Sequence, residues 1–397
     1  MRSPHRAATS PAPRRHRRGA LLTALTGALV TASLSVPAGA PAAPVAPVES
    51  STVALGPVSA APLAARTQER RRRDNPPPEL GVQFHGLWSS YSDADRAGVL
   101  DRLVDMGAGW VRLDMSWAMI QPTAGRIDPA GWGVRFVDRV VDMASERGLK
   151  VLATFWLTPG WAGPEAGERS LPADPRDYGR ALAWAADRWA GQVQAWEVWN
   201  EPNSKDFLAG ADPAAYADLL CAAHDAVRPA TAGGPQLVFG GTMHNDSEWI
   251  EAAYDAGAGA CFDVLATHPY QSPSDTGPMS GSGESQWEFS HLAEVRALMR
   301  RHGDTRPVWV TEFGWSSHSD RGGEQPWERG VSRRQQGTFT VAALEALRKQ
   351  FPFVKKAFLY NDRARTDAGR HMKGYGLMTP GLKPKPVYRA VQRWAGR

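Results

Sequence analysis

From residue 80 onwards the sequence alternates short β-branched or aromatic runs with amphipathic segments, and this alternation restricts the fold more than any other feature. The runs predict eight strands, at residues 81–86, 109–115, 150–156, 193–199, 236–242, 262–270, 307–315 and 354–362. The amphipathic segments predict helices near residues 93–107, 132–147, 175–190, 213–228, 247–256, 287–302, 332–349 and 385–395. Strands that alternate with helices pair in parallel through right-handed crossovers.

Eight strand–helix units within residues 80–397 match the size of a closed barrel, so the predicted fold class is α/β, a single (β/α)₈ TIM barrel with a disordered N-terminal leader. An open doubly wound sheet is the alternative, although no Gly-x-Gly-x-x-Gly or phosphate-loop pattern follows the first strand. The active site of such a barrel lies where the strands end. Polar and aromatic residues crowd these ends, namely His85, Asp114, Trp156, Asn200, Glu201, Thr242, His268, Tyr270, Glu312, Trp315, Tyr360 and Asn361.

The first 79 residues differ from this pattern. Residues 14–18 are Arg-Arg-His-Arg-Arg, and an apolar run of 17 residues and a small-residue stretch follow them. This order predicts a signal peptide over residues 1–42, a Pro/Ala-rich linker over 43–79 and the barrel domain over 80–397. Thr, Gly and Ser interrupt the apolar run, so we expect a secreted protein with no stable membrane span after cleavage. The paired arginines leave both the general and the twin-arginine export routes open.

The distribution of charge argues against nucleic acid as a partner. Residues 1–79 hold eleven arginines and four acidic residues, which leaves 35 basic against 37 acidic residues in the barrel domain. No basic run follows Arg73, so the domain lacks a patch that would neutralise phosphates. The two cysteines, Cys221 and Cys261, can form a disulfide in an exported protein, but their pairing depends on Cα geometry and stays open.

Two strand ends carry glutamates that suit hydrolysis of a glycosidic bond. Strand four ends in Trp199-Asn200-Glu201-Pro202-Asn203, and strand seven contains Thr311-Glu312-Phe313-Gly314-Trp315. These strands lie across the barrel from one another, so both side chains can reach one ligand. Such hydrolysis needs one carboxyl to protonate the leaving oxygen and one to attack the anomeric carbon, about 5–5.5 Å apart in retaining enzymes.

These motifs resemble the clan of (β/α)₈ retaining glycoside hydrolases, over residues 80 to about 395. The resemblance implies that Glu201 is the acid/base and Glu312 the nucleophile. Together with Thr267-His268-Pro269-Tyr270, the motifs look closest to family 39-like members and to family 5 cellulases, and both families stay open.

The predicted substrate-binding residues surround this pair: Asn200, Arg112, His268, Tyr270, Trp156, Trp315, Tyr360 and His85. Asn200 should bond the sugar 2-hydroxyl, and Tyr270 should donate to Glu312. Arg112 should point inward, pair with Glu197 and lower the pKa of the nucleophile, so that the nucleophile is charged and the acid/base is protonated. His268 should bond the substrate or the surroundings of the nucleophile.

Aromatic side chains and two loops should shape the cleft. Trp156, Trp315 and Tyr360 are the predicted platforms at the cleavage point, and Trp88, Trp117 and Trp161 are predicted outer platforms. His85 is equally compatible with a core position. The loops at residues 271–286 and 316–330 should wall the cleft, because both follow strands at the catalytic face.

The sequence thus predicts a retaining glycosidase that cleaves β-linked glycans. The alternative is a catalytically weak or inactive barrel that binds carbohydrate at the cell envelope. We expect an oligo- or polysaccharide substrate, a monomer, no cofactor and no metal. The sugar, the choice between endo and exo action, and transglycosylation in place of hydrolysis all stay open.

Overall fold

The computed structural model describes residues 75–163, 167–230 and 234–396. The predicted signal peptide lies outside these residues, as does the predicted linker up to residue 74. Strand β1 begins at Glu79, one residue before the predicted start of the domain. None of the helices within the described ranges has the length and apolar character needed to cross a membrane.

The strands form one parallel barrel. They are β1 (Glu79–Gln83), β2 (Trp110–Ser116), β3 (Lys150–Trp156), β4 (Val193–Val198), β5 (Gln236–Phe239), β6 (Thr242–Met243), β7 (Leu265–His268), β8 (Val308–Phe313) and β9 (Val354–Leu359). They pair in the order β5-β4-β3-β2-β1-β9-β8-β7-β6. Since β5 and β6 are consecutive parts of the fifth barrel strand, and Val238 bridges to Val264, the sheet closes on itself. The barrel prediction is confirmed, and the open-sheet alternative is wrong.

The fifth strand was predicted as one run, and the structure interrupts it at two glycines. A Cβ atom at Gly241 would lie 2.3 Å from Nε2 of His268 and 2.5 Å from Oγ1 of Thr311. The Gly241 carbonyl accepts a hydrogen bond from the backbone N–H of Glu201 at 3.0 Å. The strand therefore leaves the ladder here because its backbone supports the loop that carries Glu201.

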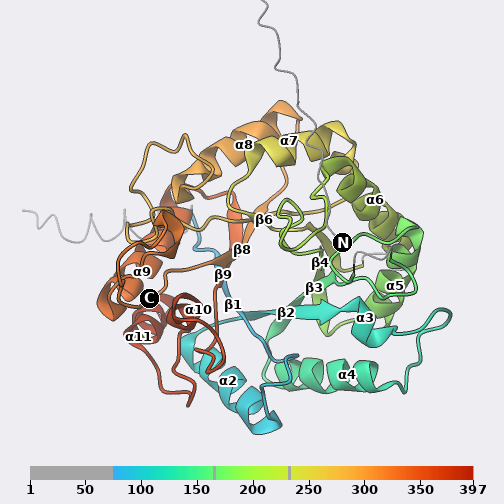
Figure 1. Ribbon diagram of the computed structural model, residues 1–397, viewed down its shortest axis with the longest axis horizontal. Helices are drawn as coiled ribbons and strands as arrows, with labels where there is room; N and C mark the ends of the chain where they lie inside the picture. Colours follow the sequence, from blue (N-terminus) through green and yellow to red (C-terminus); the bar gives the residue numbers. More distant parts are fainter. Residues whose placement is uncertain (1–74, 164–166, 231–233, 397) are drawn as a thin grey trace, which may run out of the picture. The chain divides into compact units, whose positions relative to one another are not determined.

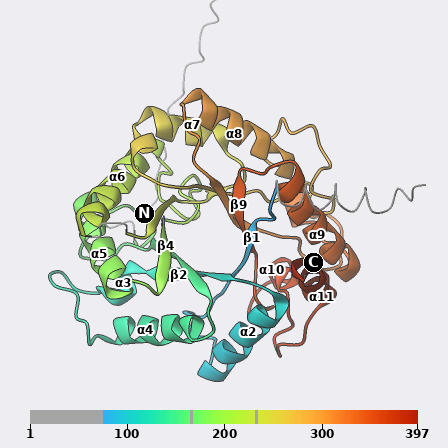
Figure 2. The same ribbon diagram turned by 180° about the vertical axis from the view of Figure 1, so that it is seen from behind.

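The helices form a ring around the strands (Figures 1 and 2). They are α2 (Asp93–Met106), α3 (Trp117–Ile120), α4 (Trp132–Ser145), α5 (Pro175–Arg188), α6 (Pro213–Ala230), α7 (Ser247–Asp255), α8 (Leu292–Arg301), α9 (Arg333–Lys349), α10 (Arg370–Tyr375) and α11 (Pro386–Ala395), with 3₁₀ turns η1 (Ala258–Ala260), η2 (Phe289–His291) and η3 (Pro326–Glu328). Capping boxes begin α2 at Ser92 and α9 at Ser332. The sequence did not predict α3 and α10, which are too short to show a helical period.

Apolar side chains close the N-terminal end of the barrel interior. They are Trp110, Leu152, Ala195, Val238, Val264, Ala266, Trp309 and Phe358. The rings of Trp110 and Trp309 meet edge to face at 5.6 Å, and Nζ of Lys356 lies 4.3 Å from the centre of the Trp110 ring. A larger core fills the space between the strands and the helices. Among the described residues, this packing therefore fills the barrel interior on the side away from the C-terminal ends of the strands.

A disulfide joins Cys221 of α6 to Cys261, with Cα atoms 4.9 Å apart and a separation of 40 residues. It ties a helix of the outer ring to the segment that leads into β7. The structure thereby answers the question that the sequence left open.

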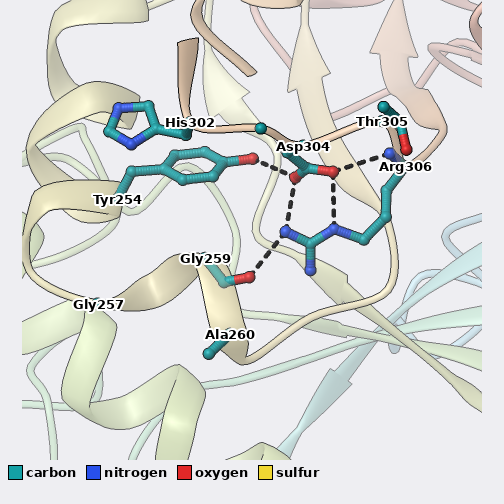
Figure 3. Close-up of a pocket in the computed structure, with 9 residues that line it drawn as sticks. Tyr254, Gly257, Gly259, Ala260, His302, Asp304, Thr305 and Arg306 are labelled. Atoms are coloured by element: carbon teal, nitrogen blue, oxygen red, sulfur yellow. Dashed lines mark hydrogen bonds and ion pairs between the residues drawn. The ribbon is translucent and has the colours of Figure 1, made fainter. Parts of the chain in front are cut away.

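The segments that lead into β7 and β8 also line a cavity of about 510 Å³ (Figure 3). Because these segments precede their strands, the cavity lies at the N-terminal face of the barrel. Here the Asp304 carboxylate accepts from the Tyr254 hydroxyl at 2.6 Å and from Nε of Arg306 at 2.9 Å. Arg306 also donates to the carbonyl of Gly259 at 2.7 Å. These polar groups bond one another, which is typical of a structural network at the stabilising face of a barrel.

Candidate active site

The two predicted glutamates converge on one cavity. Glu201 follows β4, Glu312 lies near the end of β8, and both line a cavity of about 630 Å³. Three atoms all lie within 4.8 Å of one another: one carboxylate oxygen of Glu201, one carboxylate oxygen of Glu312 and one ring nitrogen of His268. Both carboxyls are largely buried, so water screens their charges only weakly.

The loop that carries Glu201 has an unusual backbone. Trp199 has φ of 73° and Glu201 has φ of 44°, in the left-handed region that costs a residue with a side chain about 1–3 kcal/mol. Hydrogen bonds hold this conformation: Trp199 N–H donates to the Phe155 carbonyl at 3.0 Å, and Asn203 donates to the Met243 carbonyl at 3.0 Å. The surrounding strands therefore fix the position of the Glu201 carboxyl.

Two donors hold Glu312. Nη1 of Arg112 lies 2.6 Å from its Oε1 atom, and the Tyr270 hydroxyl donates to its Oε2 atom at 2.8 Å. Arg112 is fully buried and also donates from Nε to Glu197 at 2.6 Å. The predicted contacts of Tyr270 with Glu312 and of Arg112 with Glu197 are both present. These contacts fix the carboxylate and leave it little freedom to rotate.

Arg112 also orients the amide of Asn200. Nη2 of Arg112 donates to Oδ1 of Asn200 at 2.8 Å. Because the oxygen is engaged by the guanidinium, the amide nitrogen is free to donate, and Asn200 lines the cavity. The side chain therefore presents an N–H group to a ligand hydroxyl.

Glu201 has a different partner. Nδ1 of His268 lies 2.9 Å from Oε1 of Glu201, and Nε2 of His268 lies 3.0 Å from Oγ1 of Thr311. Burial holds the pKa of His268 well below its usual range, with a further contribution from the Arg112 charge. The imidazole is therefore neutral and supplies a hydrogen bond without a charge.

The two carboxyls differ in their affinity for a proton. Burial raises the pKa of Glu201 well above its usual range, and the nearby charge of Glu312 raises it further. Burial also raises the pKa of Glu312, but Arg112 and the Tyr270 hydrogen bond oppose this increase. The predicted order is present, since a shared proton favours Glu201. The net pKa shift of Glu312, however, is upward, because burial outweighs Arg112.

Among the described residues, Glu201, His268 and Glu312 are the set that could offer three ligand atoms to a metal. Arg112 and Tyr270 already occupy the oxygens of Glu312, and His268 occupies one oxygen of Glu201. A second cation would lie next to the Arg112 guanidinium. The donor set therefore suits proton transfer better than coordination.

Five of the eight predicted substrate-binding residues line the cavity: Asn200, Tyr270, Trp156, Tyr360 and His85. Arg112 and His268 do not; they are fully buried behind the glutamates and act by positioning them. The prediction for Trp315 is wrong, because its indole N–H donates to the Thr276 carbonyl at 2.9 Å and its ring packs against Phe339. The loop after β7 covers this ring, and strand alternation alone does not show that cover.

Of the predicted outer platforms, only Trp88 lines the cavity, where its ring lies 3.8 Å from that of His85. Trp117 is fully buried and donates to Gln121 at 2.7 Å. Trp161 packs edge-on against Trp117 at 5.6 Å. Both rings pack with the core because the part of the segment after β3 that carries Trp161 lies against the end of α3, where the indole N–H donates to the Gln121 carbonyl at 2.9 Å. Arg169, farther along the same segment, does line the cavity.

Several residues that line the cavity were not predicted from the sequence. Trp287 directly follows the predicted loop 271–286, and Trp327 lies within the predicted loop 316–330. The two side chains are 39% and 48% exposed, with ring centres 6.1 Å apart. Exposed tryptophans beside Ser- and Gly-rich loops were a usable signal. Tyr375 on α10 lines the cavity with its ring 5.8 Å from Tyr270, and no sequence pattern marked it.

A pair of buried carboxyls at the mouth of a (β/α)₈ barrel is the arrangement that hydrolysis of a glycosidic bond requires. The sequence matches the family described as cellulase (glycosyl hydrolase family 5) over residues 74–344. The chain belongs to this family. The match decides between the two families that the sequence motifs left open.

Solved structures share the fold. A family 39 glycoside hydrolase from Bacteroides cellulosilyticus has 22% identity and a TM-score of 0.62, covering 80% of this chain and 64% of its own. A monomeric β-xylosidase from Caulobacter crescentus has 18% identity and a TM-score of 0.59, covering 81% and 69%. An exo-β-1,4-mannosidase from an Opitutaceae bacterium has 17% identity and a TM-score of 0.58, covering 80% and 59%. At these identities the likeness shows the fold alone.

A β-glucosidase 1B from Phanerodontia chrysosporium is 30% identical over 110 residues, which are 26% of this chain and 20% of that protein. The chain thus spans a fifth of this relative and less than two thirds of the family 39 structure.

Proposed function

We propose that this protein is a secreted retaining glycosidase that cleaves β-linked glycans by double displacement, with Glu201 as acid/base and Glu312 as nucleophile. The observation that carries the proposal is the arrangement of the two carboxyls. Their oxygens approach within 4.8 Å, Arg112 and Tyr270 hold one, and neutral His268 holds the other. Such a separation fits the retaining geometry of about 5–5.5 Å and leaves no room for the water that inversion needs at about 6.5–9.5 Å.

In the first step, a carboxylate oxygen of Glu312 forms a bond to the anomeric carbon while the glycosidic bond breaks. Glu201 gives its proton to the departing oxygen and becomes a carboxylate. The raised pKa of Glu201 suits it to hold this proton near neutral pH. Arg112 stays bonded to Glu312 throughout and limits its motion during attack.

In the second step, Glu201 takes a proton from water, and the water oxygen attacks the anomeric carbon. The bond to Glu312 breaks, and both carboxyls return to their starting states. Two inversions at one carbon retain the configuration. The amide N–H of Asn200 faces the cavity, where it would bond the sugar 2-hydroxyl, a contact that strengthens in the transition state.

The cavity walls support a glycan substrate. Aromatic rings line it on several sides, at Trp88, Trp156, Trp287, Trp327 and Tyr360. Flat aromatic faces stack on the apolar faces of sugar rings and so suit a pyranose better than a charged peptide. The printed names of the similar proteins include a β-xylosidase, a β-glucosidase and an exo-β-1,4-mannosidase, which supports a β-linkage without choosing the sugar.

Export is part of the proposal. The basic, apolar and small-residue order of the N-terminal sequence supports it. The Cys221–Cys261 disulfide supports it independently, since such bonds persist in oxidising compartments.

The test is to incubate residues 75–397 and the Glu312→Gln variant with β-linked polysaccharides and aryl β-glycosides. Product anomers are followed by NMR at early times. Release of β-anomers by the parent alone supports the proposal. Binding of glycans by both proteins without any release favours the carbohydrate-binding alternative.

A further inference from the structure

A second cavity, of about 390 Å³, lies on the far side of α10 from the catalytic cavity. The loop after β8, the start of α9, α10 and the segment before α11 surround it. Five cationic side chains line it, Arg321, Arg333, Arg370, Lys373 and Lys385, and its lining includes no Asp or Glu. The surface of a nearly neutral domain usually mixes positive and negative side chains. A cluster of positive side chains alone therefore requires an explanation.

The positive charge of this cavity is largely uncompensated. Arg370 pairs with Glu324 at 2.7 Å. Within the described ranges, no carboxylate lies at ion-pair distance from Arg321, Arg333, Lys373 or Lys385. Other exposed arginines of this protein do have such partners, as Arg188 has in Asp138 at 2.6 Å. The lining therefore retains several unpaired charges that converge on one space.

Lys385 is the most telling of these residues, because it is only 6% exposed. Its Nζ donates to the Gly374 carbonyl at 2.7 Å, which uses one of the three ammonium N–H groups. Burial and the neighbouring charge of Arg333 lower the pKa of Lys385 to about 7. A buried ammonium without a countercharge is costly, and an anion in the cavity would remove that cost.

Two helices add to the positive potential. Arg333 is the first residue of the 17-residue helix α9, and Lys385 is the residue that precedes the first turn of α11. Helix N-termini carry partial positive charge and direct free N–H groups outward. Both termini border the same cavity as the unpaired side chains.

We propose that this cavity binds a tetrahedral oxyanion, phosphate or sulfate, either free or carried on a glycan. Cations that reach one space from four chain segments suit a compact ion with several oxygens better than a planar carboxylate. The site shares α10 with the catalytic cavity: Arg370 and Lys373 face the anion site, whereas His371, Met372 and Tyr375 line the catalytic cavity. A bound anion therefore braces one wall of the active site. This inference does not depend on the proposed glycosidase mechanism.

The test is isothermal titration of the protein with sodium sulfate, and separately with inorganic phosphate, below neutral pH and at ionic strength held constant with chloride. Sulfate keeps its charge over this pH range. The variants are Arg333→Gln, Lys373→Gln and the double variant, and the matched control is Arg334→Gln, which removes the adjacent exposed arginine outside the cavity. Circular dichroism and the Tm verify that each variant folds like the parent.

We expect saturable binding of one ion per chain in the parent and in Arg334→Gln. Each single cavity variant should bind roughly 10- to 150-fold more weakly, since a hydrogen bond to a charged group contributes about 1.5–3 kcal/mol. The double variant should show no saturable binding. Absence of saturable binding in the parent, or equal affinity in the parent and the folded double variant, overturns the proposal.

A second arm identifies the source of the anion. A sulfated oligosaccharide, its neutral counterpart and free sulfate are titrated into the Glu312→Gln variant, so that cleavage does not consume the ligand. Tighter binding of the sulfated oligosaccharide than of free sulfate, lost in the double cavity variant, assigns a glycan-borne group. Equal affinities assign the free ion. If Arg333→Gln and Lys373→Gln weaken the neutral oligosaccharide as much as the sulfated one, the site does not recognise an anion.

Discussion

Nδ1 of His268 lies 2.9 Å from Oε1 of Glu201, while burial keeps the imidazole neutral. A charged imidazolium at this distance would lower the pKa of Glu201 and release its proton too early. The neutral ring instead fixes the carboxyl without changing its charge. The position of the Glu201 carboxyl thus depends on a buried histidine that does not itself line the cavity.

The first prediction concerns the pH dependence of Glu201. In the proposed mechanism the protonated form of Glu201 is the active form, so kcat/KM of the parent should fall as the pH rises through the raised pKa of Glu201. Glu201→Gln should remove this basic limb. It should also slow cleavage of unactivated glycosides by about 10²–10⁴-fold, while aryl glycosides with acidic leaving groups should lose less. Initial rates over a pH series test both points, and a basic limb that persists in the variant contradicts the assignment.

The second prediction concerns Arg112, whose charge opposes the rise in the pKa of Glu312. Arg112→Met should raise that pKa further. Because Glu312 attacks as a carboxylate in the proposed mechanism, the acidic limb of kcat/KM should move to higher pH. The variant also leaves Glu197 unpaired in the interior, so the free energy of unfolding should fall by about 3–5 kcal/mol.

This Arg112 variant is measured below its Tm, with Arg334→Gln as an exposed control. A loss of stability with an unmoved acidic limb would mean that Arg112 is only structural.

The third prediction concerns Gly241. A methyl group there would lie 2.3 Å from Nε2 of His268, so Gly241→Ala should displace the imidazole from Glu201. We expect kcat to fall more than KM changes, with a stability loss of about 1–3 kcal/mol. Gly109→Ala is the matched control, since its Cβ meets no atom within 4 Å. Equal kcat and KM in the two variants would show that the close approach of Gly241 to His268 does not affect catalysis.

The fourth prediction concerns the exposed aromatic pair at the rim of the cavity. Trp287→Ala and Trp327→Ala should raise KM for oligosaccharides about two- to tenfold, because an aromatic contact contributes about 0.5–1.5 kcal/mol. For small aryl glycosides kcat should change little, since these rings lie at the rim. Trp132→Ala, at a 68% exposed ring on α4, is the control and should change neither. An unchanged KM for every oligosaccharide would show that Trp287 and Trp327 do not contact the substrate.

The fifth prediction concerns the disulfide. Cys221→Ser/Cys261→Ser should lower stability by about 3–4 kcal/mol, because the bond closes a loop of 40 residues. Activity well below the Tm should be retained, since the bond lies far from the strand ends. Thermal unfolding with and without a reductant measures the effect. An identical Tm in both states would contradict a stabilising bond.

The barrel and the convergence of Glu201 and Glu312 were predictable, because the barrel follows from a periodic sequence pattern and the glutamates from short local motifs. Eight alternations and two short motifs identify the strands, and parallel strands bring their ends together without knowledge of any side-chain contact. Contacts between distant segments were not predictable. Trp315 has the expected place in the sequence, yet the loop after β7 covers it.

The same reason explains what the sequence analysis missed at α10. Tyr375 reaches the cavity through a six-residue helix that has no apolar period. The five cations of the anion site are dispersed between residues 321 and 385, so no basic run marks them. Charge clusters formed by folding require the tertiary structure.

The most direct test of the account is to trap the intermediate. The protein is incubated with an activated 2-deoxy-2-fluoro-β-glycoside, whose fluorine slows release of the sugar, and is then analysed by intact mass and peptide mapping. We expect one covalently bound sugar per chain on the peptide that contains Glu312, and none in Glu312→Gln. The exposed-site control, Glu248→Gln, should label like the parent. A bound sugar on another residue, or turnover that releases only α-anomers without any covalent species, would contradict it.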